Sequence, residues 1–139
     1  MKKKNAVAFL PERFREALAS AGKTQAELAT AVGVSKRTIQ RYMAGTPIPQ
    51  SRVRSEICRV LNINTLWVVG HEEQKERTPS QKYVDRLIES SIALKKDEQL
   101  YELALALMEM PGQDVETVAQ ALGTPAHMEP VAVLKRAKR

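Results

Sequence analysis

The feature that most constrains this chain is residues 23–49, KTQAELATAVGVSKRTIQRYMAGTPIP, in which two short helical signals meet at one glycine. Thr24 to Glu27 reads T-x-x-E, the capping box that begins many helices. Gly33 ends that run, because glycine accepts the left-handed backbone that reverses a chain after a helix. Ser35 is a favourable N-cap for a second helix. The stretch therefore predicts two short helices joined by a tight turn.

The rest of the chain also favours helix over strand. Aromatic residues make up only 4% of the sequence, and Ala, Leu, Glu, Lys, Arg and Gln dominate it. Apolar residues recur at helical spacing, and no long run alternates apolar with polar positions. We predict an all-α fold with helices over residues 11–21, 25–32, 36–44, 51–61, 65–69, 80–94, 97–110 and about 115–122.

Charge divides the chain. Residues 1–62 hold 12 Lys and Arg against four Asp and Glu, whereas residues 63–130 hold six against 12. The last nine residues add four more cations. A basic front half favours a polyanionic partner. We predict a basic domain over residues 1–70, a linker over 71–80, a second helical segment over 81–123 and a basic, flexible tail over 124–139.

The predicted helix over 36–44 has two different faces on a helical wheel. Ile39 and Tyr42 share one side, which suits a core. Long hydrogen-bond donors share the other side: Lys36, Arg37, Gln40 and Arg41. Lys and Arg match the guanine edge in the major groove of DNA, and Gln matches adenine. The alternative is a solvated basic face without a partner.

The spacing around this helix carries a family resemblance. The pattern Thr24-Gln25-x-Glu27-Leu28-Ala29-x-x-Val32-Gly33-Val34-Ser35-x-x-Thr38-Ile39-x-x-Tyr42-x-x-Gly45 resembles the helix-turn-helix of the phage-repressor (Cro/C1, Xre-type) family. The resemblance covers about residues 11–70 and implies a five-helix bundle. The family often has Trp where this chain has Tyr42, which keeps an aromatic side chain there.

The resemblance also implies roles for single residues. Lys36, Arg37 and Arg41 fall where the family reads bases, and Gln40 is added by its place on the same face. Gln25 would clamp a phosphate and brace the recognition helix. The other expected DNA-backbone contacts are Thr24, Ser35, Thr38 and Thr46. A cytoplasmic, nucleoid-associated protein of bacterial or phage origin is implied as well.

The predicted C-terminal helices have stripes of apolar side chains that they cannot bury alone. Packing on the first domain is one solution, and pairing with a second copy is the one we favour. A dimer would place two recognition helices about 34 Å apart on a pseudo-palindromic operator. The predicted oligomerisation residues are Leu87, Ile88, Ile92, Leu100, Leu103 and Leu107.

Three functions compete at this point. The first is a dimeric, sequence-specific transcriptional repressor. The second is an antitoxin-like or phage regulatory module whose C-terminal helices bind a small protein partner. The third is an adaptor that has lost DNA binding, and the four donors on one helix face argue against it. The clusters Lys2–Lys4 and Lys135–Arg139 could add phosphate contacts or could simply be charged, disordered ends.

The sequence offers no residues for other chemistry. His71 and His127 have no Cys or His at ligand spacing, which predicts no metal site and no cofactor. No Ser/His/Asp arrangement or glycine-rich phosphate loop is present, so no enzyme is predicted. The single cysteine, Cys58, lies among apolar residues and is expected to be buried in a reducing compartment. No apolar run approaches the ~20 residues that span a membrane.

Overall fold

The computed structural model describes residues 6–90, 94 and 96–123 of the 139-residue chain. Every regular element among these residues is an α-helix, apart from two isolated β-bridges, which confirms the all-α prediction. The chain divides into two compact units, Met1–Arg77 and Thr78–Arg139.

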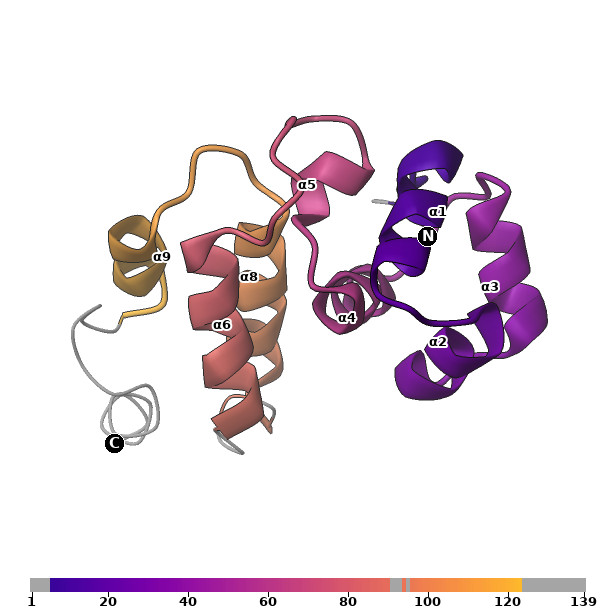
Figure 1. Ribbon diagram of the computed structural model, residues 1–139. Helices are drawn as coiled ribbons and strands as arrows, with labels where there is room; N and C mark the ends of the chain where they lie inside the picture. Colours follow the sequence, from indigo (N-terminus) through magenta and orange to yellow (C-terminus); the bar gives the residue numbers. More distant parts are fainter. Residues whose placement is uncertain (1–5, 91–93, 95, 124–139) are drawn as a thin grey trace. The chain divides into compact units, whose positions relative to one another are not determined.

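The first unit contains five helices, labelled in Figure 1. They are α1 (Pro11–Ser20), α2 (Gln25–Val32), α3 (Lys36–Met43), α4 (Ser51–Leu61) and α5 (Thr65–Val68). The bounds of α2 and α4 agree with the sequence-based prediction, and the other three end one residue earlier. Pro11 occupies the first turn of α1, where its missing N–H costs no hydrogen bond.

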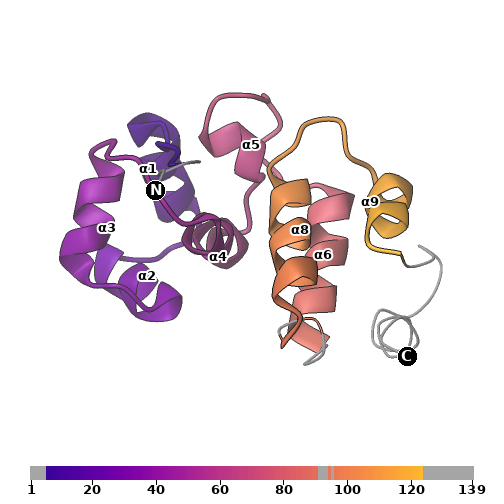
Figure 2. The ribbon, with the colours of Figure 1, turned by 180° about the vertical axis from the view of Figure 1, so that it is seen from behind.

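One apolar core holds the five helices together. Phe14 of α1, Leu28 of α2, Ile39 of α3 and Ile57 of α4 are each fully buried in it. Cys58 is buried in the same core, as expected, and is not part of a disulfide. Trp67 closes the core from α5. The core fixes α2 and α3 side by side, and α3 lies at one edge of the bundle in Figures 1 and 2.

Gly33 makes the tight turn between α2 and α3 possible. Its φ of 87° lies in the left-handed region, and its N–H donates to the carbonyl of Ala29 at 2.8 Å. A Cβ added there would meet no atom within 4 Å, so only backbone strain opposes a side chain. We expect Gly33→Ala to lower the free energy of unfolding by about 1–2 kcal/mol. Gly33→Asn is the control and should cost less, because Asn tolerates this conformation; equal losses in thermal unfolding would contradict the strain argument.

Residues 71–77, which the sequence analysis assigns to a linker, pack on the first unit. The Asn64 N–H donates to the carbonyl of Lys75 at 2.9 Å, and Ile63 pairs with Glu76 in a β-bridge. Arg77 is buried and donates to the carbonyl of Ile63 at 2.8 Å. These contacts make the segment part of the domain, and its polar composition gave no sign of them.

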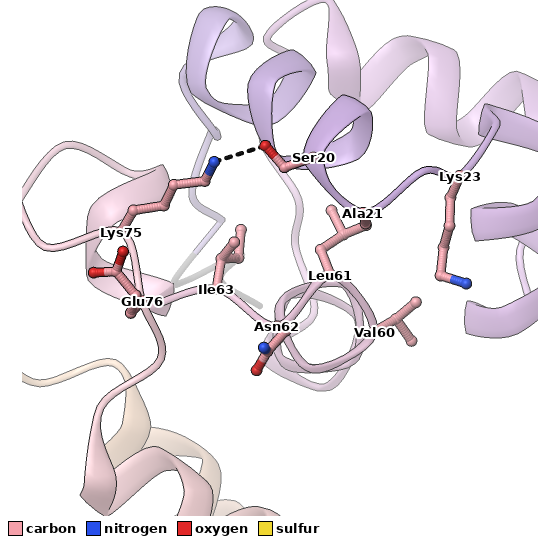
Figure 3. Close-up of a pocket in the computed structure, with 9 residues that line it drawn as sticks. All are labelled: Ser20, Ala21, Lys23, Val60, Leu61, Asn62, Ile63, Lys75 and Glu76. Atoms are coloured by element: carbon pink, nitrogen blue, oxygen red, sulfur yellow. Dashed lines mark hydrogen bonds between the residues drawn. The ribbon is translucent and has the colours of Figure 1, made fainter.

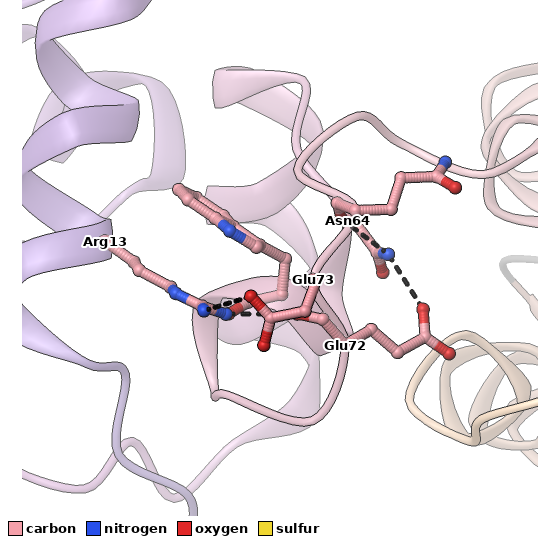
Figure 4. Close-up of polar contacts among 6 residues, drawn as sticks. Arg13, Asn64, Glu72 and Glu73 are labelled. Carbon is pink, nitrogen blue, oxygen red and sulfur yellow. Dashed lines mark hydrogen bonds and ion pairs between the residues drawn. The ribbon is translucent and has the colours of Figure 1, made fainter.

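A second set of polar contacts holds the same segment, as Figure 4 shows. Arg13 of α1 donates to the Trp67 and Glu72 carbonyls at 2.7 and 3.0 Å, and it forms an ion pair with Glu73 at 3.0 Å. The amide group of Asn64 donates to the carboxylate of Glu72 at 3.0 Å. The segment is therefore held by hydrogen bonds and an ion pair to α1 and to the residue that precedes α5.

The second unit has a separate core. Its described helices are α6 (Pro79–Ser90), α8 (Glu98–Met108) and α9 (Val115–Ala121). Val84, Leu87, Ala104, Leu105 and Val118 are among the side chains buried between them. Three side-chain caps begin these helices. The Thr78 hydroxyl accepts from the Gln81 N–H at 3.2 Å, Asp97 caps α8 and Asp114 caps α9. Hydrogen bonds from the Thr117 hydroxyl and N–H lower the pKa of Asp114.

Candidate nucleic-acid interface

The helix–turn–helix itself is built by two caps. The Thr24 hydroxyl accepts from the Glu27 N–H at 3.1 Å, and the Glu27 carboxylate accepts from the Thr24 N–H at 2.9 Å. The predicted capping box is therefore confirmed. Ser35 begins α3 by accepting from the Thr38 N–H at 3.0 Å. With Gly33 between the two caps, both helix starts are fixed by local chemistry alone.

Helix α3 turns one face into the core and the other to solvent. Ile39 is 0% exposed and Met43 is buried beside it, while Tyr42 is half-buried against the same core. The four predicted base-reading residues are all exposed: Lys36, Arg37, Gln40 and Arg41. Within the described part of the chain, these four side chains have no ion pair and no side-chain hydrogen bond. Their donors are therefore free to meet a ligand.

The predicted backbone-contact residues lie at the starts of α2 and α3 and just after α3. Thr24 and Gln25 lie at the start of α2, and Ser35 and Thr38 at the start of α3. The Ser35 and Thr38 hydroxyls are 2.9 Å apart and share one hydrogen, so the pair can offer one hydroxyl donor outward. Thr46 follows α3, and its N–H donates to the carbonyl of Arg41 at 3.1 Å.

This part of the chain matches a known protein family. The helix-turn-helix family model matches residues 14–68, from α1 to the end of α5. Residues 14–68 are a helix-turn-helix domain of the Cro/C1 type. The first unit thus holds a DNA-binding regulatory domain of the helix-turn-helix type, and α3 is the second helix of its helix–turn–helix. Comparisons with curated proteins and with solved structures gave no match.

One pocket of the first unit lies apart from α3. It has a volume of about 330 Å³ and is drawn in Figure 3. None of its lining residues belongs to α3: Ser20, Ala21, Lys23, Val60, Leu61, Asn62, Ile63, Lys75 and Glu76. The Lys75 ammonium group already donates to Ser20 at 2.8 Å and pairs with Glu16 at 3.1 Å. The Lys75 cation at this pocket is therefore already paired with groups of the protein itself.

The described residues also bear on metal binding and on insertion into a membrane. No group of three or more His, Cys, Asp or Glu residues that could hold a metal ion occurs there. No helix in the described part of the chain is both long and apolar enough to cross a membrane. His71 is exposed, and His127 lies outside the described residues.

The predicted oligomerisation residues fall into different places. Leu87, Ile88 and Leu107 are buried in the second unit's own core, and Leu100 is half-buried against it. Leu103 is 40% exposed on α8. Ile92 lies outside the described residues, as do the basic clusters 2–4 and 135–139. The apolar stripes are thus largely covered within the unit, and the accessible part is centred on Leu103.

Proposed function

We propose that this protein is a sequence-specific transcriptional regulator that places α3 in the major groove of a DNA operator. Lys36, Arg37, Gln40 and Arg41 read base edges in this proposal. Contacts from the starts of α2 and α3 and from Thr46 hold the phosphate backbone and set the register of the helix. The observation that carries the proposal is the exposed, unpaired set of four donors on the recognition helix of a helix-turn-helix domain.

Selection of bound duplexes from random DNA tests this function. We expect enriched sites with two inverted half-sites whose centres lie about one helical turn apart, because a two-fold dimer presents two recognition helices at that spacing. A pool that stays random after repeated selection at moderate ionic strength would contradict base readout. A single, non-repeated half-site would support base readout and contradict the dimer.

A dimer that represses by covering a promoter is the finer form of the proposal. Its support is the exposed side of α8, where Leu103 and Ala106 lie close to Met110 just beyond the helix. Leu103 and Met110 are 40% and 48% exposed, and apolar side chains that are exposed together on one surface mark a possible protein interface. The same surface could instead receive a small partner protein, as in an antitoxin-like regulator.

We expect Leu103→Glu to convert a dimer to a monomer by placing a charge on this surface. Light scattering after size exclusion should then give the 15.5 kDa mass of one chain instead of twice that mass. Gln120→Glu introduces the same charge at an exposed position of α9 and is the control. A wild-type chain that is already monomeric, or that co-purifies with a small protein, would favour the partner-binding alternative.

A further inference from the structure

The loop that follows the recognition helix is held by a buried arginine. Arg54 of α4 is only 2% exposed, and its guanidinium donates to the Ile48 carbonyl at 2.6 Å. Ile48 is itself fully buried in the core. A guanidinium in a protein interior is costly because it loses its hydration, so this side chain is not a simple core filler.

The N-terminal segment holds the same loop from a second direction. Val7 and Ile48 exchange backbone hydrogen bonds of 3.1 and 2.8 Å, so the Ile48 carbonyl accepts from both Val7 and Arg54. The segment is fixed in turn by an edge-to-face contact between Phe9 and Phe14, with ring centres 5.2 Å apart. Residues 6–10 precede the family match at 14–68, so the Val7 half of this clamp on Ile48 lies outside the matched residues.

The clamped loop is also joined to the recognition helix. The Thr46 N–H closes the last turn of α3 on the Arg41 carbonyl, two residues before Ile48. The chain from Arg41 to Ile48 is therefore fixed at both ends. The distance between Arg41 on α3 and the loop around Thr46 is thus set before DNA binds. A loose loop would have to be ordered on binding, which costs free energy.

We propose that Arg54 is a positioning residue for DNA binding, which together with the Val7 backbone pre-sets the loop around Thr46 for its phosphate contact. The inference rests on the proposed DNA-binding function. The contacts of Arg54 and Val7 with Ile48 set the affinity for DNA and the register of the protein on it, whereas α3 reads the identity of the bases. Loss of the clamp should therefore weaken binding to all duplexes in similar measure and leave the base preference unchanged.

The test compares Arg54→Met with Arg59→Met in the full chain. Both residues lie on α4, but Arg59 pairs with Glu56 at 2.7 Å and is partly exposed. For Arg54→Met we expect about tenfold weaker binding to the selected site. This change corresponds to the loss of one or two charged hydrogen bonds between the loop and a phosphate. The salt dependence should be shallower by about one phosphate, and phosphate protection beside the loop should disappear. Arg59→Met should bind like the wild type.

A second pair of variants keeps the test decisive if Arg54→Met fails to fold. Val7→Pro removes the N–H that donates to Ile48, whereas Val7→Ala keeps it. Val7→Pro should reproduce the loss of affinity and of phosphate protection, and Val7→Ala should not. Unchanged binding in folded Arg54→Met and Val7→Pro, or an altered base preference, would overturn the proposal.

Amide hydrogen exchange separates this inference from the proposed function. The Ile48 and Thr46 N–H groups should exchange faster in Arg54→Met and Val7→Pro than in their controls, whether or not DNA is bound. If the wild type prefers no duplex, the proposed function fails while faster exchange still reports the clamp. If the wild type binds a selected site and exchange is unchanged in both variants, the clamp alone is wrong.

Discussion

Arg37→Ala and Arg41→Ala should each weaken binding to a selected operator by roughly 5- to 150-fold, or about 1–3 kcal/mol. Both guanidinium groups stand on the exposed face of α3, and neither side chain supports the core. An arginine that donates two hydrogen bonds to a guanine edge loses both when it is truncated. Binding to a scrambled duplex should fall much less, because that binding depends on total charge.

The control for this pair is Arg86→Ala. Arg86 is an exposed residue of α6 in the second unit, so the variant removes the same charge outside the helix-turn-helix domain. Titrations of each variant with the selected and scrambled duplexes should show a smaller specificity ratio only for the two α3 variants. Site selection repeated with Arg37→Ala should show relaxed preference at one base position. Equal losses on both duplexes would assign the arginines to the phosphate backbone.

The sequence predicted the first unit well because local chemistry fixes its elements. The Thr24–Glu27 box and Ser35 each begin a helix with their own side chains, and Gly33 and Gly45 follow helix ends. Apolar spacing then placed the core-facing residues correctly, including Ile39. Such signals lie within a few residues of the feature they cause, so one sequence is enough to find them.

The features that the sequence analysis missed depend on contacts between distant residues. Charged side chains are rarely buried in a protein, yet Arg54 and Arg77 are both buried and donate to backbone carbonyls. Backbone acceptors leave no mark in a sequence. A partial signal did exist, because Arg54 lies three residues before Ile57 on the apolar stripe of α4. The Thr78–Gln81 capping box was readable as T-x-x-Q and was overlooked.

Ile39→Ala should have the largest effect on stability, with a loss of about 2–5 kcal/mol in the free energy of unfolding. The side chain is 0% exposed and lies on the core-facing side of α3, where truncation leaves a cavity. Such a loss is a large part of the stability of a small domain. DNA binding should disappear in the temperature range where this unit melts, although no DNA-contacting group has been removed.

The two cores make a sharper form of this prediction possible. Ile39 belongs to the core of the first unit, and Leu87 belongs to the separate core of the second, where it is also fully buried. If the units unfold independently, Ile39→Ala lowers only the transition that abolishes DNA binding. Leu87→Ala should lower the other transition and leave binding by the first unit intact. Calorimetry combined with binding measured across the same temperatures checks this. One shared transition that both variants lower equally would mean that the cores are energetically coupled, so that the second unit stabilises the recognition helix.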